Sequence, residues 1–341
     1  MKKGYTLLSI GFLIVFIAAC APQTGIVETE QAMPATATSE TKKVPIRIEM
    51  PSDADVADIP WLIAIDTLKE QGYDLEPLSF SETAIEVAAM AQGDLDISSM
   101  NNQVAWAAIE KGAPIATFLD KTINVNMAMV GKEIQSCMDL DGKPFAVPGI
   151  TSISYIMFKT FLEKNCPGVE PQIIPLSGGS NRLAALMAGE VSGTISDVDD
   201  LLKLERENPG EYHPLVVFAD EFPGLQQDSS LFRREFADQN PEVIKDIIRA
   251  VFAARESIQD PKVLEAALIK YLEMEPEEAQ EAAEVYLAQK VWDTDFLLSL
   301  DVVKANLEFL QQNGDLTAEL TPEKVSDLSF YDEVVKEFKS E

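Results

Sequence analysis

Side chains that commonly carry out acid–base, nucleophilic or metal chemistry are scarce in this sequence, which has one histidine and three cysteines among 341 residues. His213 precedes Pro214 at the start of the apolar stretch 215–218, which indicates a residue at the edge of a strand. Most metal sites, Ser/His triads and near-neutral general bases depend on histidine. The composition therefore argues against an enzyme, and we expect no metal and no cofactor.

Carboxyl groups are instead concentrated in the segments that follow predicted strands. These segments are 50–61, 79–83, 98–103, 148–155, 177–182 and 196–200. Their acidic residues are Asp53, Asp55, Asp58, Glu82, Asp197, Asp199 and Asp200, against a single basic residue, Arg182. An unpaired like charge at 4 Å in a partly buried site costs about 4 kcal/mol. The surplus of acids therefore disfavours an anionic ligand and favours a neutral or weakly basic one.

Three aromatic residues, Trp61, Phe80 and Tyr155, lie in the same segments. Their faces could enclose a ring while carboxylates accept hydrogen bonds from its amines, which fits an aminopyrimidine or a flavin. Core packing is the alternative for each ring, and helix capping is the alternative for Asp58 and Asp197. The candidate ligand-binding residues are Asp53, Asp58, Trp61, Phe80, Glu82, Met100, Asn101, Gly149, Thr151, Ser152, Tyr155, Ser180, Arg182 and Asp197.

A glycine pair opens the predicted helix that carries Ser180 and Arg182. The run 178–182 fits either a phosphate-binding nest or an ordinary tight turn. With the hydroxyl groups of Thr151 and Ser152 at another helix N-terminus, it could also hold nitrate or a sulfonate. An oxyanion ligand therefore remains the alternative to a heterocycle.

The N-terminus indicates an extracytoplasmic lipoprotein. Residues 1–19 combine a basic start with an apolar stretch too short to span a bilayer, as in a signal peptide. They end Ile17-Ala18-Ala19 before Cys20, which resembles a bacterial lipobox, so Cys20 is the predicted lipidation site. The rest of the segment 20–43 is rich in Thr, Ala, Glu and Pro and reads as a flexible tether. The lipid would be the only attachment to the membrane.

The formal net charge is −30, from 27 basic and 57 acidic residues. Long-range repulsion then opposes any polyanionic partner, so nucleic acid and anionic membrane surfaces are excluded.

From residue 44 onward, short β-rich runs alternate with helix-periodic segments up to about residue 218. This pattern predicts parallel α/β sheets in two blocks. Residues 241–341 are expected to be almost wholly helical, with Pro241, Pro261, Pro276 and Pro322 each in the first turn of a helix. Ligand sites of such sheets lie beyond the carboxyl ends of the strands.

Cys137 precedes one predicted strand, and Cys166 follows the helix that runs back from that strand's far end. Both cysteines should therefore lie at the same end of one βα unit, where a disulfide can form outside the cytoplasm. Two buried free thiols are the alternative.

Several runs of residues carry a resemblance to a known family. They are 93–97 (GDLDI), 110–114 (EKGAP), 139–144 (DLDGKP), 184–193 (AALMAGEVSG), 314–316 (GDL) and 325–331 (VSDLSFY). In their order and spacing they resemble ABC-transporter solute-binding proteins for nitrate, sulfonates and thiamine-pyrimidine precursors, over residues 44–341. The chain departs from the family at 191–194, where Val-Ser-Gly-Thr replaces a usual Val-Asp-Ala, and in the loop 51–58.

The resemblance implies an α/β, type II periplasmic-binding-protein fold of two lobes joined by a two-segment hinge, with a helical C-terminal portion. Lobe 1 would comprise residues 44–121 plus 222–341, and lobe 2 residues 122–221. A monomer would capture a small molecule between the lobes and deliver it to an ABC permease and its ATPase.

Two other functions stay open beside this transport role. Some fungal relatives are enzymes that make the thiamine pyrimidine, consuming a histidine and a lysine-bound cofactor and carrying a Cys-rich motif, which the single His213 and the absence of a cysteine cluster disfavour. A lipid-anchored receptor that signals without transport is the other.

Overall fold

The computed structural model describes residues 45–51, 54–80, 82–121, 125–150, 152–222, 224–292, 294–295, 298–314 and 316–339. The predicted signal peptide, Cys20 and the tether lie outside these residues, as do Asp53 and Thr151. Within the described residues, no helix combines the length and the apolar character needed to cross a membrane.

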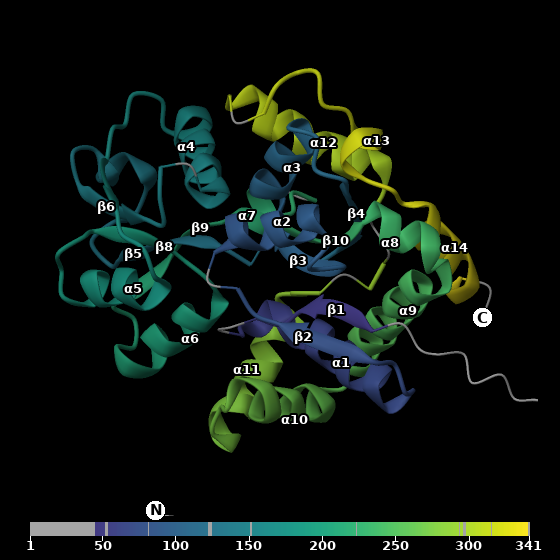
Figure 1. The fold of residues 1–341 in the computed structure, drawn as a ribbon. Coiled ribbons are helices and arrows are strands. Elements are labelled where there is room, and N and C mark those ends of the chain that lie inside the picture. The colour runs from purple at the N-terminus through teal and green to yellow at the C-terminus, as the bar shows by residue number, and fades with distance from the viewer. Residues whose placement is uncertain are drawn as a thin grey trace, which may run out of the picture. The chain divides into compact units, whose positions relative to one another are not determined.

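In the described part of the chain, ten strands form two sheets of five (Figure 1). The first sheet has the order β2 (Leu75–Leu78), β1 (Ile46–Glu49), β3 (Ile97–Asn101), β10 (Asp228–Arg233) and β4 (Ile115–Asp120). The second has the order β7 (Gln172–Pro175), β6 (Pro144–Val147), β8 (Gly193–Ser196), β5 (Met127–Gly131) and β9 (Tyr212–Val217).

Both sheets are mixed: the predicted parallel pairing holds for β1 with β2 and β3 and for β6 with β7 and β8, but not for the strands that pair with β10 and β5. Strand β10 runs antiparallel to β3 and β4, and β5 runs antiparallel to β8 and β9. Strand β10 was not predicted because its buried residues include Ser229 and Ser230, which interrupt the apolar pattern expected of a central strand. The antiparallel direction places Asp228, the first residue of β10, opposite Asn101 at the carboxyl end of β3.

Helices connect the strands and form most of the C-terminal part. Those between strands are the 3-10 helix η1 (Val56–Asp58), α1 (Ile59–Glu70), α2 (Thr83–Gln92), α3 (Asn102–Glu110), the 3-10 helix η2 (Cys137–Leu140), α4 (Ile153–Asn165), α5 (Gly179–Met187), α6 (Val198–Glu207) and α7 (Phe218–Glu221). After β10 come α8 (Arg234–Gln239), α9 (Pro241–Ser257), α10 (Pro261–Leu272), α11 (Pro276–Ala288), α12 (Leu300–Gln312), α13 (Pro322–Val325) and α14 (Ser329–Phe338). The four prolines begin α9, α10, α11 and α13, as predicted.

Three of the candidate residues cap helices. Asn101 caps α3, Ser152 caps α4, and Asp197 caps α6 by accepting a hydrogen bond from the Asp200 amide at 3.1 Å. The candidate residue Ser180 does not cap a helix, because α5 begins at Gly179 and its N-cap is Gly178, with a φ of 85°. A glycine adopts this conformation without strain, so the cap position passes to it.

Among the described residues, two hydrophobic clusters form the core. The larger one includes Ile48, Trp106 and Phe118 of the first sheet and its helices, together with Phe145 and Phe158 beside the second sheet. The smaller one joins the second sheet and the helices α5 and α6 to the helical pair α10 and α11. Figure 1 shows α10 and α11 lying side by side.

Gly193 explains one departure from the family pattern. A Cβ atom at this position of β8 would lie 2.6 Å from the ring of Phe145, which is closer than packed side chains allow. The Phe145 ring stacks on Phe158 with their centroids 4.0 Å apart. The stacked pair therefore fills the space that an alanine methyl group would take.

Cys137 and Cys166 form a disulfide, with their Cα atoms 6.1 Å apart. It links η2 to the end of α4 and closes a loop that contains β6.

Replacing both cysteines by alanine should lower the free energy of unfolding by about 3 to 4 kcal/mol, because a loop of this length restricts the unfolded chain by that amount. Urea unfolding of the oxidised wild type and the double variant measures the difference. The exposed neighbour Met138 supplies a control, since Met138→Ala should leave the unfolding midpoint unchanged. Equal midpoints for the wild type and the cysteine variant would contradict the prediction.

Candidate functional site

A buried ion pair between Asp58 and Lys121 lies at the edge of the first sheet where its parallel strands end. Asp58 ends η1, and Lys121 follows the last residue of β4. The Lys121 ammonium lies 2.7 Å from Asp58 Oδ1, and their side chains are 14% and 5% exposed. Asp58 also accepts a hydrogen bond from the Asp55 amide, while Asp55 caps η1 through the Ala57 amide. The pair therefore fixes the loop between β1 and α1. Asp58 occupies the N-cap position of α1, but its side chain makes no capping hydrogen bond to that helix.

Burial alone would lower the pKa of Lys121, but the charges of Asp58 and Asp228 outweigh burial, and the pKa is raised overall. Lys121 is therefore a permanent cation of this edge. Asp228 lies beside it and accepts a hydrogen bond from the Asn101 amide group at 3.4 Å. Burial raises the pKa of Asp228.

Two more carboxyl groups, Glu49 and Glu86, are buried at the same edge. Glu49 ends β1, and Glu86 on α2 accepts a hydrogen bond from the Ser98 hydroxyl of β3. Burial and the charge of Glu86 raise the pKa of Glu49 to about 8. Burial raises the pKa of Glu86 to about 7, even though the Ser98 hydrogen bond favours its charged form. Near neutral pH this pair therefore holds protons that ordinary glutamates would have released.

The second sheet contributes an acidic group where α6 begins. Asp197, Asp199 and Asp200 lie in its cap and first turn, and burial raises the pKa of each of them. With the charge of Asp197 added, the pKa reaches about 7 for Asp199 and about 6 for Asp200. The positive end of the helix stabilises such charges.

Arg182 of α5 is a cation whose charge acts on Asp197 and Asp200 of this acidic group. It donates to the carbonyl oxygens of Ile195 and Leu176 at 3.1 and 3.4 Å, at the carboxyl ends of β8 and β7. Burial lowers its pKa, while the charges of Asp200 and Asp197 act in the opposite direction.

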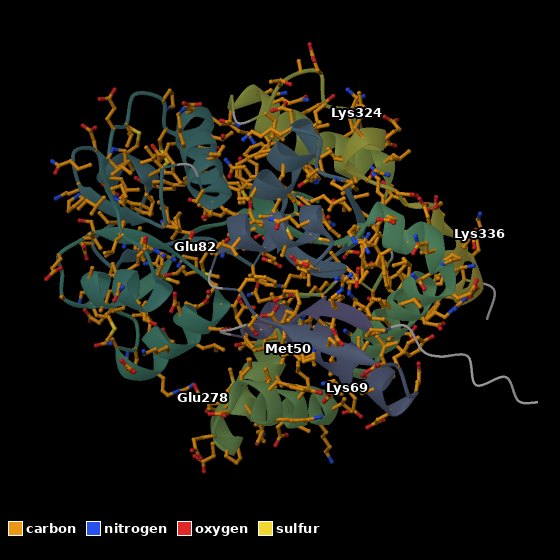
Figure 2. The ribbon with its side chains drawn as sticks, viewed as in Figure 1. Met50, Lys69, Glu82, Glu278, Lys324 and Lys336 are labelled. Carbon is orange, nitrogen blue, oxygen red and sulfur yellow. A yellow bond between two sulfur atoms is a disulfide. The ribbon has the colours of Figure 1, made fainter. Side chains whose placement is uncertain are left out.

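The two acidic regions are close enough to influence each other. Asp55 is open to solvent, but protein atoms crowd its carboxyl group, and this crowding with the charge of Asp58 raises its pKa to about 6. The charge of Asp197 also acts on Asp55. From α11, the buried Tyr286 donates a hydrogen bond to Asp199, which raises the pKa of the tyrosine together with burial. An ion pair of 3.0 Å between Arg206 and Glu278 joins α6 and α11 further along (Glu278 is labelled in Figure 2).

The structure thus brings together Asp58, Asn101, Arg182 and Asp197 among the predicted residues. Trp61 and Met100 are core residues instead, and the Trp61 indole donates to the Glu49 carbonyl at 3.2 Å. Tyr155 lines a groove of about 350 Å³ between α4 and residues 168–173. The other predicted residues have separate places: Phe80 packs on the larger cluster, Glu82 and Ser180 are exposed near the N-termini of α2 and α5, and Gly149 accepts hydrogen bonds from Ser152. Figure 2 labels Glu82.

Sequence reasoning missed the residues that stand just outside the predicted loops or far along the chain. Glu49 and Lys121 sit at the last residue of a strand and one residue beyond another. A wider window at each strand end would have included both. Glu86, Asp228 and Tyr286 reach the site from a helix, an unpredicted strand and the C-terminal region, and no local signal marks them.

Among the described residues, this constellation contains eight carboxyl groups and two cations. They are Glu49, Asp55, Asp58, Glu86, Asp197, Asp199, Asp200 and Asp228, with Lys121 and Arg182. Carboxylates accept hydrogen bonds from N–H groups, and protonated carboxyls can also donate. The described part of the chain holds no group of three or more His, Cys, Asp or Glu side chains placed to bind a metal ion. His213 lies apart in β9, paired with Val130.

Comparisons with known proteins agree with this architecture. Residues 68–263 match the NMT1/THI5-like family, and the chain belongs to that family. The taurine-binding periplasmic protein of Escherichia coli (strain K12) is 27% identical over 198 residues, which are 57% of this chain. The alignment spans only 61% of that relative's length.

Solved structures show the same fold at low sequence identity. A putative periplasmic sulfonate-binding protein SsuA from Methylobacillus flagellatus KT has a TM-score of 0.69 at 16% identity, covering 88% of this chain and 96% of its own. The periplasmic nitrate-binding protein NrtA from Synechocystis PCC 6803 has a TM-score of 0.66 at 14% identity, covering 88% and 90%. The predicted periplasmic-binding-protein fold, with two α/β parts, is confirmed.

The raised pKa values of Glu49 and Glu86 predict that the protein becomes less stable as the pH rises from about 5 to 8. Above pH 5 the unfolded chain has released most of both protons, whereas the folded protein keeps the Glu86 proton up to about pH 7 and the Glu49 proton up to about pH 8, so the folded state binds more protons. Each group then lowers the free energy of unfolding by up to about 1.4 kcal/mol per pH unit. Groups with lowered pKa values, such as Glu110 and Asp139, change charge only at more acidic pH.

Urea unfolding at intervals of half a pH unit tests this slope. The variant Glu49→Gln with Glu86→Gln stays neutral throughout and should have a flatter profile, whereas Glu278→Gln on the surface of α11 should keep the wild-type slope. A wild-type stability that rises between pH 5 and 8 would show that these carboxyls are ionised in the folded protein.

Proposed function

We propose that the chain is the extracytoplasmic solute-binding component of an ABC importer and captures a small nitrogen heterocycle or a similar N–H-rich molecule. Residues 44–121 plus 222–341 would form one lobe and 122–221 the other, with the chain crossing near 121 and 221. The ligand would lie where the carboxyl edges of the two sheets meet, and its capture would mark the protein as loaded for the permease and ATPase. Membership of the family and the shared fold support this role.

The observation that carries the ligand class is the surplus of carboxyl groups at those edges. Lys121 is already paired with Asp58, and Arg182 is tied to two carbonyl oxygens. The remaining acids offer acceptors for a ligand that supplies N–H donors. An anion would instead add a negative charge close to carboxylates, at about 4 kcal/mol for each unpaired contact at 4 Å.

A neutral carboxyl group adds a more specific complement. With a pKa of about 8, Glu49 is protonated at pH 7 and can donate one hydrogen bond while accepting another. An aminopyrimidine presents a ring nitrogen acceptor beside an amino donor, which matches this pattern. The thiamine-pyrimidine type of ligand therefore suits a site that contains neutral and charged carboxyls together.

The second candidate is a sulfonate, nitrate or another small oxyanion. The name of the taurine-binding relative and the basic Arg182 next to the first turn of α5 favour it. Taurine carries an ammonium group as well as a sulfonate, so carboxylates could bind one end while Arg182 and a helix N-terminus bind the other. Nitrate has no such positive group and fits the acidic surroundings less well.

A binding role also agrees better with the side chains than the pyrimidine-synthesising enzyme does. That chemistry consumes a histidine, and His213 is part of strand β9 rather than of the acidic constellation. A receptor that signals without transport would use the same ligand site, and the genes beside this one would distinguish the two roles.

A thermal-shift panel tests the ligand class. The panel contains 4-amino-5-hydroxymethyl-2-methylpyrimidine, riboflavin, taurine, an alkanesulfonate and nitrate, each added to the purified protein. A ligand at 100 times its Kd stabilises the folded state by about 2.7 kcal/mol, and we expect this from the aminopyrimidine. Asp197→Asn keeps a good helix cap but loses a charge, and should weaken binding by about 10-fold to 100-fold.

The half-exposed carboxyl of Glu278, which pairs with Arg206, provides the matched control, because Glu278→Gln makes the same chemical change outside the constellation. Stabilisation by nitrate or a simple alkanesulfonate, with none by a heterocycle, would contradict the proposed ligand and support the second candidate. Stabilisation by taurine alone would support the aminosulfonate form of that candidate.

The lipid anchor has a direct test of its own. Expressed in a bacterium with [³H]palmitate, the wild type should be labelled and sediment with membranes, because the acylated Cys20 adds apolar chains that partition into lipid. Cys20→Ser should be unlabelled and soluble, whereas the double variant of Cys137 and Cys166 should still be labelled. Palmitate incorporation by Cys20→Ser would disprove lipidation at that residue.

A further inference from the structure

Arg255 is a buried cation outside the loops of the candidate site. It lies near the end of α9 and is 2% exposed. Its Nη1 atom is 2.9 Å from Asp120 Oδ2, and the Asp120 side chain is fully buried. A buried charge of this kind is costly unless its partner and its remaining donors are satisfied. The other contacts of the guanidinium therefore indicate what it is placed to hold.

Those contacts are with the main chain at the end of β4. Nη2 donates to the carbonyl oxygen of Asp120 at 2.7 Å and to that of Lys121 at 3.0 Å. One planar group thus holds two consecutive carbonyls and the Asp120 side chain. A lysine has a single nitrogen and cannot reproduce this fixed fork.

The residue held in this way is the cation of the first-sheet edge. Lys121 extends from this clamped backbone to Asp58, 2.7 Å from its ammonium. Arg255 and Lys121 also line one small cavity of about 10 Å³ with Ala57, Pro60 and Trp61 around η1 and α1. This volume admits no more than about one water molecule, so the groups around it have little freedom to move independently.

We propose that Arg255 is a positioning residue that fixes the backbone of Lys121 and thereby holds the lysine on Asp58 in the binding site. Its relevance to ligand binding rests on the proposed function, whereas the positioning itself does not. Without the guanidinium contacts, the backbone at the end of β4 would shift. The Lys121 ammonium would then no longer be held within ion-pair distance of Asp58. Asp58 would then be left as an uncompensated carboxylate beside the ligand.

The accessibility of the Lys121 amine can be measured without any ligand. The protein is treated with the amine-reactive N-hydroxysuccinimide acetate, and peptide mass spectrometry gives the rate of acylation of each lysine. In the wild type Lys121 should react far more slowly than Lys132, whose side chain is 61% exposed. In Arg255→Met and in Arg255→Lys, Lys121 should react on the order of tenfold faster. Lys132 should be unchanged in both.

Val251→Ala is the matched control for general destabilisation, since Val251 lies one turn earlier on α9, is buried and lines the same cavity without polar contacts. It should lower the Tm yet leave Lys121 protected. If Arg255→Met does not fold, Arg255→Lys carries the test, because it retains the charge beside Asp120. Folded Arg255 variants with Lys121 at its wild-type reactivity, or equal exposure of Lys121 in Val251→Ala, would overturn the proposal.

The ligand arm uses whichever compound of the thermal-shift panel binds the wild type. Arg255→Lys and Lys121→Met should weaken its binding to a similar extent, and the double variant should be no weaker than Lys121→Met alone. Additive losses would show that Arg255 acts independently of Lys121. If no compound binds the wild type, the proposed function fails, and the acylation result still decides the positioning role.

Discussion

The burial of carboxyl groups with too few cations is the constraint on which this structure depends. Among the described residues, the candidate site sets eight carboxyls against the two basic side chains of Lys121 and Arg182, while the neighbouring Asp120 is paired with Arg255. Full ionisation there would cost several kcal/mol per unpaired group. The protein reduces this cost in three ways: protons stay on Glu49 and Glu86, Lys121 pairs with Asp58, and the N-terminus of α6 faces Asp197. The surplus that remains is available to a ligand with N–H groups.

The topology of the sheets creates this concentration. Strands that run in one direction end at one edge, so Glu49, Asn101 and Asp120 come together from three separate strands. The reversed strand β10 starts at the same edge and adds Asp228. Helix α11 then brings Tyr286 to Asp199 from almost ninety residues further along the chain. A cluster assembled in this way depends on long-range packing rather than on any short motif.

This origin explains which features could be predicted from the sequence. Helix starts at Pro241 or Asp197 are local, because a proline or a capping side chain acts within one turn. The alternation of strands and helices gave the fold class for the same reason. Strand β10 could not be found, since serines occupy its buried centre. Trp61 was placed at the ligand although it belongs to the core, because an aromatic residue after a strand suits both positions equally well.

The two candidate ligand classes differ in how their affinity depends on pH, because they bind to different protonation states of the carboxyl groups. An ammonium or another cation binds best to ionised carboxylates, so its binding would release protons from groups such as Asp199, whose pKa is about 7. A neutral aminopyrimidine can instead use a protonated carboxyl as donor and acceptor together, and its binding would keep the proton in place. Affinity for a cation must then fall as the pH drops through 7, whereas affinity for the neutral heterocycle must fall as the pH rises through 8 and Glu49 ionises. The arrangement of carboxyls alone does not choose between these ligands, but the direction of the pH dependence does.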